Sequence, residues 1–113
     1  MKIGIYMRYS TENQELKVQK DEIHKYIEYT FKKESIESIT EYIDEGYSGK
    51  DMNRNSLERL KNDILSNKID TIIALKLDRL SRSIQDLLLL FNFFEKQNIT
   101  IHLVKEKLDT STA

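Results

Sequence analysis

The sequence predicts an α/β fold: a mainly parallel sheet of four to five strands with helices on both faces. Short apolar runs alternate with segments whose apolar residues recur at helical spacing, in the order strand, helix, strand, helix, strand, helix, strand. The run IDTIIALKL at 69–77 is apolar enough to be buried on both faces, as strands of parallel sheets are. The 113 residues are 33% charged and 39% apolar, which suits one globular domain with a buried core.

The first half of the chain predicts a strand, a helix, a second strand and a loop. KIGIYMRYS opens with an apolar run that predicts a buried strand over 2–8. ESITEYI at 37–43 predicts the second strand, and DEGYSGKDMN at 44–53 predicts a loop because it holds two of the three glycines. The helix between the strands is predicted from apolar residues at mostly helical spacing: Leu16, Ile23, Tyr26, Ile27 and Phe31.

The second half predicts two helices and two strands. The strands are the apolar run at 69–77 and ITIHLV at 99–104. The first helix is predicted from Leu57, Leu60, Ile64 and Leu65. The second helix is predicted from Ile84, Leu87, Leu88, Phe91 and Phe94, and its start is expected near Leu80. The last four of these residues make one apolar face.

This last helix is apolar beyond one face, because Leu89, Leu90 and Phe93 lie off the face just named. A helix that is apolar on most sides is expected to be buried on most sides. Two environments stay open: packing between layers of the core, or a subunit interface, where exposed apolar patches are common.

The composition excludes several classes of protein. There is no cysteine, so disulfides and thiolate metal sites are excluded. His24 and His102 are far apart and lack a metal-ligand pattern, so each is expected on the surface or packed in the core. No signal peptide is expected from the first residues, and the longest apolar run, at 87–91, is too short to span a membrane. The net charge of −1 restricts any nucleic-acid contact to local basic clusters.

Polar residues gather where the predicted strands end. In parallel α/β sheets, ligands bind outside the carboxyl ends of the strands. The chain has 13 lysines but only five arginines, and arginine is preferred where a planar grip on phosphate is needed. The polar residues that follow the first three predicted strands are Arg8, Ser10, Asp44, Asp78, Arg79 and Arg82.

Their spacing allows several of these side chains to converge on a phosphate. Arg8 and Ser10 share strand parity, and a helix that begins near residue 80 would turn Asp78, Arg79 and Arg82 one way. Serine would then be the nucleophile and the arginines would stabilise the charge of the transition state. Asp78 would orient an arginine or handle a proton.

Plainer interpretations of the same residues stay open. Asp78, Arg79 and Arg82 are also typical of an ion-paired helix start, and such surface pairs are weak. Arg8 alone is typical of an exposed strand end. Ser10 is also a normal residue for capping the following helix.

Four segments, in order and at matching spacing, resemble the blocks of the serine recombinases, the resolvase/invertase group. They are YMRYSTENQ at 6–14, DEGYSGKDMNRNSL at 44–57, IDTIIALKLDRLSRS at 69–83 and LDTSTA at 108–113. The resemblance covers the whole chain, and the third block is nearly complete. Tyr9 and Asn55 depart from the commonest family residues, and neither is a chemical group of the mechanism.

The resemblance implies a flavodoxin-like or resolvase-like fold and the catalytic domain of a site-specific DNA recombinase over 1–113. Ser10 would attack a DNA phosphodiester, form a 5′-phosphoserine bond and release a 3′ hydroxyl. Four subunits would exchange the ends and rejoin them. The phosphoserine bond conserves the energy, so neither a cofactor nor a metal is expected. The implied partners are double-stranded DNA and further copies of the full-length protein, as a homodimer or homotetramer, with no membrane and no small-molecule substrate.

The resemblance also assigns roles to residues. Arg8, Arg79 and Arg82 would stabilise the transition state, and Asp78 would order the arginines. The residues implied to support the site or bind phosphate are Gln14, Gln19, Ser48, Arg54 and Lys76. In the family a long assembly helix and a DNA-binding region follow the DTST segment, so both are expected to be absent here. A cytoplasmic protein encoded by a bacterium or a mobile element is implied.

Two rival functions stay open. One is a catalytically silent resolvase-like regulator that binds DNA, against which the presence of Ser10 and the arginines argues. The other is a flavodoxin-like phosphate-binding or receiver-type domain. A receiver would cluster acids around a metal, whereas this chain places arginines at the strand ends. Residues 1–113 alone are predicted not to cleave DNA, with Ser10 Oγ more than about 3.5 Å from Arg79 and Arg82.

Overall fold

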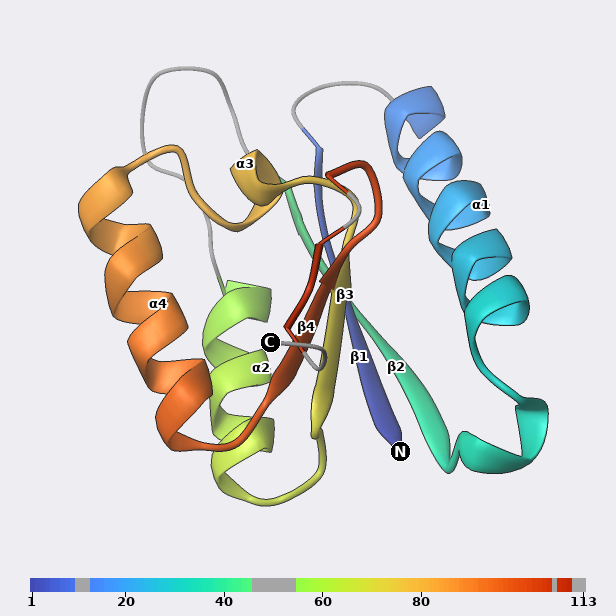
Figure 1. Ribbon diagram of the computed structural model, residues 1–113. Coiled ribbons are helices and arrows are strands. Elements are labelled where there is room, and N and C mark those ends of the chain that lie inside the picture. The colour runs from blue at the N-terminus through green and yellow to red at the C-terminus, as the bar shows by residue number, and fades with distance from the viewer. Residues whose placement is uncertain (10–12, 46–54, 107, 111–113) are drawn as a thin grey trace.

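The computed structural model has the α/β architecture that the sequence predicts (Figure 1). Its sheet has the strand order β2-β1-β3-β4-β5, in which the first four strands of the chain are parallel and β5 is antiparallel to β4. The strands are β1 (Lys2–Tyr9), β2 (Ser38–Glu45), β3 (Thr71–Ala74), β4 (Thr100–Leu103) and β5 (Leu108–Asp109). The residues that the structure describes are 1–9, 13–45, 55–106 and 108–110.

Helices cover both faces of the sheet, as predicted (Figure 1). α1 (Asn13–Thr30) lies on one face, while α2 (Asn55–Leu65) and α4 (Ile84–Lys96) lie on the other. A 3₁₀ turn, η1 (Lys33–Ser35), follows α1. A one-turn helix, α3 (Leu77–Leu80), lies at the carboxyl end of β3.

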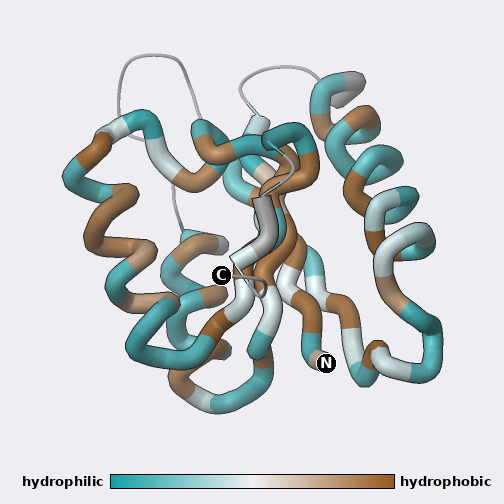
Figure 2. Tube along the Cα trace, viewed as in Figure 1, coloured by the Kyte–Doolittle hydropathy of each residue, from teal (hydrophilic) through white to brown (hydrophobic). Residues whose placement is uncertain are grey.

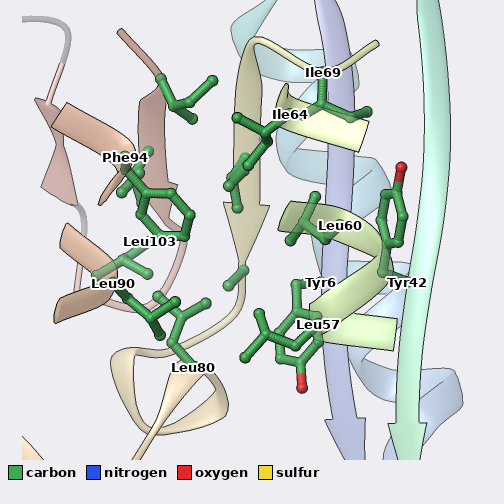
Figure 3. Close-up of a cluster of buried hydrophobic side chains, with 14 residues drawn as sticks. Tyr6, Tyr42, Leu57, Leu60, Ile64, Ile69, Leu80, Leu90, Phe94 and Leu103 are labelled. Atoms are coloured by element: carbon green, nitrogen blue, oxygen red, sulfur yellow. The ribbon is translucent and has the colours of Figure 1, made fainter. Parts of the chain in front are cut away.

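The core has two halves because side chains alternate along each strand. Ile5 and Met7 of β1 pack with Ile23 of α1. Tyr6, between them, faces the other way and packs in the cluster that includes Leu60 of α2 (Figure 3). Figure 2 shows hydrophobic residues concentrated along the central strands, where both halves meet the sheet.

Asparagines end the two helices of the second face. Asn67 follows α2 with φ 61° and Asn98 follows α4 with φ 58°, the left-handed region that asparagine tolerates. Backbone bonds close both ends: Lys68 N–H donates to the Asp63 carbonyl at 2.8 Å, and Ile99 N–H donates at 2.9 Å to a carbonyl of α4. These caps fix where β3 and β4 begin.

The predicted helix is confirmed as α4, but its expected start near Leu80 is wrong. α3 ends at Leu80, the backbone is extended at Ser81, and α4 begins only at Ile84. The reason is local: Ser83 is the N-cap of α4 and its hydroxyl accepts a hydrogen bond from Asp86 N–H at 3.3 Å. A serine hydroxyl at position 81 accepts from Ser83 N–H, which stabilises the turn.

The predicted buried face of α4 is also partly wrong. Leu90 and Phe94 are its buried residues, whereas Leu88 is 61% exposed and Leu89 is 68% exposed. α4 is therefore not wedged between layers of the core. Ile84 is exposed as well, and these three exposed apolar residues of α4 are called the α4 patch.

The remaining differences are at the ends of elements. β2 runs to Glu45, two residues beyond the prediction, and β3 is shorter than the apolar run at 69–77 because α3 starts at Leu77. His102 is buried on β4, where its Nδ1 lies 2.8 Å from the Tyr26 hydroxyl. No helix among the described residues is long and apolar enough to cross a membrane.

Candidate active site

The carboxyl ends of β1, β2 and β3 bring the candidate residues to one edge of the sheet. Arg8 near the end of β1 is paired in register with Asp44 of β2. The β3–α3 connection places Lys76, Asp78 and Arg79 beyond the end of β3, at the same edge (Figure 1). This placement follows from the parallel sheet, in which all carboxyl ends meet at one edge.

Arg8 is buried and held at both ends. Its Nη2 donates to the backbone carbonyl of Asp78 at 2.7 Å, which ties β1 to α3. Its own backbone carbonyl accepts from Gln19 Nε2 of α1 at 3.0 Å. Gln19 is buried as well, and its Oε1 has no hydrogen-bond partner among the described residues. Arg8 is thus a positioned guanidinium and not the exposed strand-end residue of the plainer interpretation.

Arg79 lies on α3 between two carboxylates. Its Nη2 is 3.2 Å from Glu15 Oε1 of α1, and its Nη1 is 3.6 Å from Asp78 Oδ1. Its Nε is buried and has no hydrogen-bond partner within the described part of the chain. The contact with Asp78 is an ion pair that is too long for a hydrogen bond, and the role of Asp78 in ordering the arginines stays a prediction.

Arg82 does not join this group in the way that the sequence predicts. Because α3 ends at Leu80, Asp78 and Arg82 do not share a helix face, and Arg82 is exposed in the connection to α4. It makes no ion pair with any described residue. Lys76 is the half-buried N-cap residue of α3, and its carbonyl accepts from Arg79 N–H at 3.1 Å.

Asp44 has a structural task at this edge. Its buried carboxylate accepts from the Tyr6 hydroxyl at 2.7 Å, from Ser56 N–H at 2.8 Å and from Leu57 N–H at 3.1 Å. The last two are N–H groups of the first turn of α2, where an acid is favourable. Asp44 therefore fixes the start of α2 against β1 and β2.

Several predicted site residues lie outside the described part of the chain. These are Ser10, Ser48 and Arg54. The expected separation of Ser10 from Arg79 lies outside it too. Gln14 is in the first turn of α1, but its side chain is not among those described.

Two residues at the site were missed by sequence reasoning. Glu15 contacts Arg79, and its position four residues before Gln19 on α1 is the signal that could have indicated it. Glu106 accepts a hydrogen bond from Leu77 N–H at 2.6 Å and so caps α3. That contact spans 29 positions of sequence and has no local signal.

The described residues contain no group of three His, Cys, Asp or Glu that could hold a metal ion. What the edge presents is two buried or half-buried guanidinium groups, Arg8 and Arg79, with an exposed third arginine nearby. Guanidinium groups fixed in this way suit the binding of a phosphate and the stabilisation of its charge in a transition state.

Comparisons with known proteins identify the family of this chain. The family described as "Resolvase, N terminal domain" matches residues 3–113. The chain is 31% identical over 108 residues to the transposon Tn917 resolvase of Enterococcus faecalis, covering 96% of this chain and 52% of that protein. The chain thus spans about half the length of this relative.

Two solved structures are similar over almost the whole chain. The N-terminal catalytic domain of TP901-1 integrase has a TM-score of 0.79 and 36% identity, covering 100% of this chain and 84% of that one. A resolvase family site-specific recombinase from Streptococcus pneumoniae has a TM-score of 0.80 and 27% identity, covering 98% and 76%. By sequence and by fold, the chain belongs to the resolvase N-terminal domain family.

Proposed function

We propose that this chain is the catalytic domain of a site-specific recombinase that cleaves and rejoins DNA through Ser10, without a metal. The observation that carries the proposal is the pair of fixed guanidinium groups at the sheet edge. Arg8 lies two residues before Ser10, and Arg79 is held beside Asp78. Membership of the resolvase family supports the assignment of this site to DNA phosphodiesters.

The proposed reaction is a transesterification. Ser10 Oγ loses its proton and attacks a DNA phosphorus, the bond from phosphorus to the 3′ oxygen breaks, and that oxygen takes up a proton. The products are a 5′-phosphoserine bond and a free 3′ hydroxyl. The reverse reaction with a different 3′ hydroxyl rejoins the strands, so the number of ester bonds is unchanged.

Arg8 and Arg79 would stabilise the additional negative charge that forms on the phosphoryl oxygens. Their donors are already fixed by the Asp78 carbonyl and by carboxylates, so little reorganisation is needed during the reaction. Arg82 is exposed, and we assign it a contact that forms when DNA is bound. Supporting roles are proposed for Gln14, Gln19, Ser48, Arg54 and Lys76.

Double-stranded DNA is the proposed substrate, and further copies of the protein are the proposed partners. A net charge of −1 gives this domain little general attraction to DNA, so the binding energy must come mainly from outside the site. The exposed Ile84, Leu88 and Leu89 of the α4 patch support assembly into dimers and tetramers. A protein with this substrate is expected in the cytoplasm.

The test is a covalent adduct. The full-length product of the gene that encodes this chain is incubated with genomic DNA of the organism that carries the gene. The protein is then denatured and examined for DNA that is bound covalently through a 5′ phosphate. We expect an adduct with the wild type, none with Ser10→Ala, and an unchanged amount with Ser35→Ala, a serine of η1 remote from the site. DNA binding without any adduct would favour the silent regulator, and no DNA binding would favour the receiver-type domain.

A further inference from the structure

One stripe of α1 connects the core to the candidate site. Glu15, Gln19, Ile23 and Ile27 follow one another at intervals of four, so they share one face of the helix. Ile23 and Ile27 are buried in the core between α1 and the sheet. The two polar members extend the same face past the core, where Gln19 donates to the Arg8 carbonyl and Glu15 reaches Arg79.

Arg79 depends on neighbours for its orientation. It lies on α3, a helix of only four residues, so its own element supplies little support. Asp78 is 3.6 Å away and is half-exposed, whereas Glu15 is nearer at 3.2 Å and is 30% exposed. Glu15 also comes from a different element, whose position is fixed by apolar packing. A long side chain held from a rigid helix loses fewer rotamers when it engages phosphate.

We propose that Glu15 is a positioning residue for Arg79, which it holds at the carboxyl edge of the sheet before DNA arrives. The inference rests on the proposed function, because Arg79 is there assigned to the reacting phosphate. It gives α1, which already supplies Gln19 to the site, a second contact there.

The negative charge of Glu15 allows a positioning role to be distinguished from a role in DNA binding. A carboxylate close to a phosphodiester repels it, so Glu15 cannot contribute attraction to the substrate. Its removal should leave the DNA affinity unchanged or slightly higher, and should lower only the cleavage rate. A side chain that merely supported the fold would, when removed, lower stability and affinity together.

The experiment compares Glu15→Ala with Glu22→Ala in the encoded protein. Glu22 is a matched control on the same helix, since it is 33% exposed and pairs with Lys105 at 2.7 Å, in the β4–β5 turn. The readouts are DNA affinity and the single-turnover cleavage rate at saturating DNA. We expect Glu15→Ala to lower the cleavage rate by about tenfold, which is a fraction of the loss caused by a 1 Å misplacement of a catalytic group. Glu22→Ala should change the cleavage rate by less than about twofold.

A double-mutant cycle identifies Arg79 as the group through which Glu15 acts. The Arg79→Lys variant keeps the positive charge but not the planar guanidinium group. In this background, Glu15→Ala should lower the cleavage rate by less than about twofold. An undiminished loss in that background would overturn the proposal. Equal rates for wild type and Glu15→Ala would overturn it as well.

A measurement without DNA separates this proposal from the proposed function. The ¹⁵N-detected side-chain signal of Arg79 should move in Glu15→Ala and stay in place in Glu22→Ala. A signal that does not move would show that the contact is absent and would overturn the proposal about Glu15. Cleavage by the wild type would still support the proposed function. Absence of any adduct from the wild type would overturn the proposed function, and the role of Glu15 with it, even where the signal moves.

Discussion

Asp44→Ala should destabilise the protein more than any surface substitution nearby. The buried carboxylate accepts three hydrogen bonds, from the Tyr6 hydroxyl and from the N–H groups of Ser56 and Leu57. Loss of the two helix N–H partners costs about 1 kcal/mol, as for a lost N-cap. A buried hydroxyl left without a partner costs about 1–3 kcal/mol more. The free energy of unfolding should therefore fall by about 2–4 kcal/mol, out of about 5–15 kcal/mol for a typical domain.

The assay is urea denaturation followed by circular dichroism, with Glu45→Ala as the control. Glu45 is the next residue of β2 and is exposed, and its one side-chain hydrogen bond with a described residue is the 3.4 Å contact with the Tyr9 hydroxyl. The control should change the free energy of unfolding by less than about 0.5 kcal/mol. Tyr6→Phe combined with Asp44→Ala should cost less than the sum of the two single changes, because they share a hydrogen bond. A loss below about 0.5 kcal/mol for Asp44→Ala would refute the structural task assigned to it.

Three further outcomes are expected. Arg8→Ala or Arg79→Ala should lower the cleavage rate by about 10²- to 10³-fold, the usual loss for one charge-stabilising donor, whereas Arg59→Ala should cost little. Arg59 lies 5.0 Å above the ring of Tyr42, away from the site, so equal losses would mean that the arginines act through general charge. Burial is the main reason that the pKa of Tyr42 is raised above its usual 10.0, and a hydrogen bond to an aspartate raises it further. Its neutral form therefore stabilises the fold below about pH 10, and this contribution should be lost as the pH rises further. Urea midpoints at increasing pH should show a smaller alkaline loss in Tyr42→Phe, and an equal loss would contradict the assignment. Leu88→Ser, in the α4 patch, should lower self-association in sedimentation without lowering the urea midpoint, and unchanged association would argue against this patch as an interface.

The fold could be predicted because each local pattern agrees with the parallel sheet. The run at 69–77 is apolar on both faces, and its central part, 71–74, forms a fully buried strand. The helices were less predictable where short polar residues compete for the backbone. Ser81 and Ser83 both bind backbone N–H groups, and this splits the expected helix into α3 and α4.

The site was predictable where it depends on strand ends and unpredictable where it depends on distant contacts. Arg8 and Asp78 were placed at one edge by topology alone, and their hydrogen bond joins residues 70 positions apart. Glu15 carries an ordinary helix-start signal, since acids are common in a first turn. Only the packing of α1 shows that this acid reaches Arg79. Arg82 was displaced from the predicted group by the break after Leu80.

The most direct test of the proposed chemistry is to locate the DNA on the protein. Adducts formed by the encoded protein would be digested with nuclease and trypsin, and the modified peptide would be sequenced by mass spectrometry. Cleavage after Arg8 and Lys17 releases YSTENQELK, residues 9–17, in which one serine stands between a tyrosine and a threonine. We predict a nucleotide joined through its 5′ phosphate to Ser10. A nucleotide on Tyr9 or Thr11, or on any other peptide, would contradict the account.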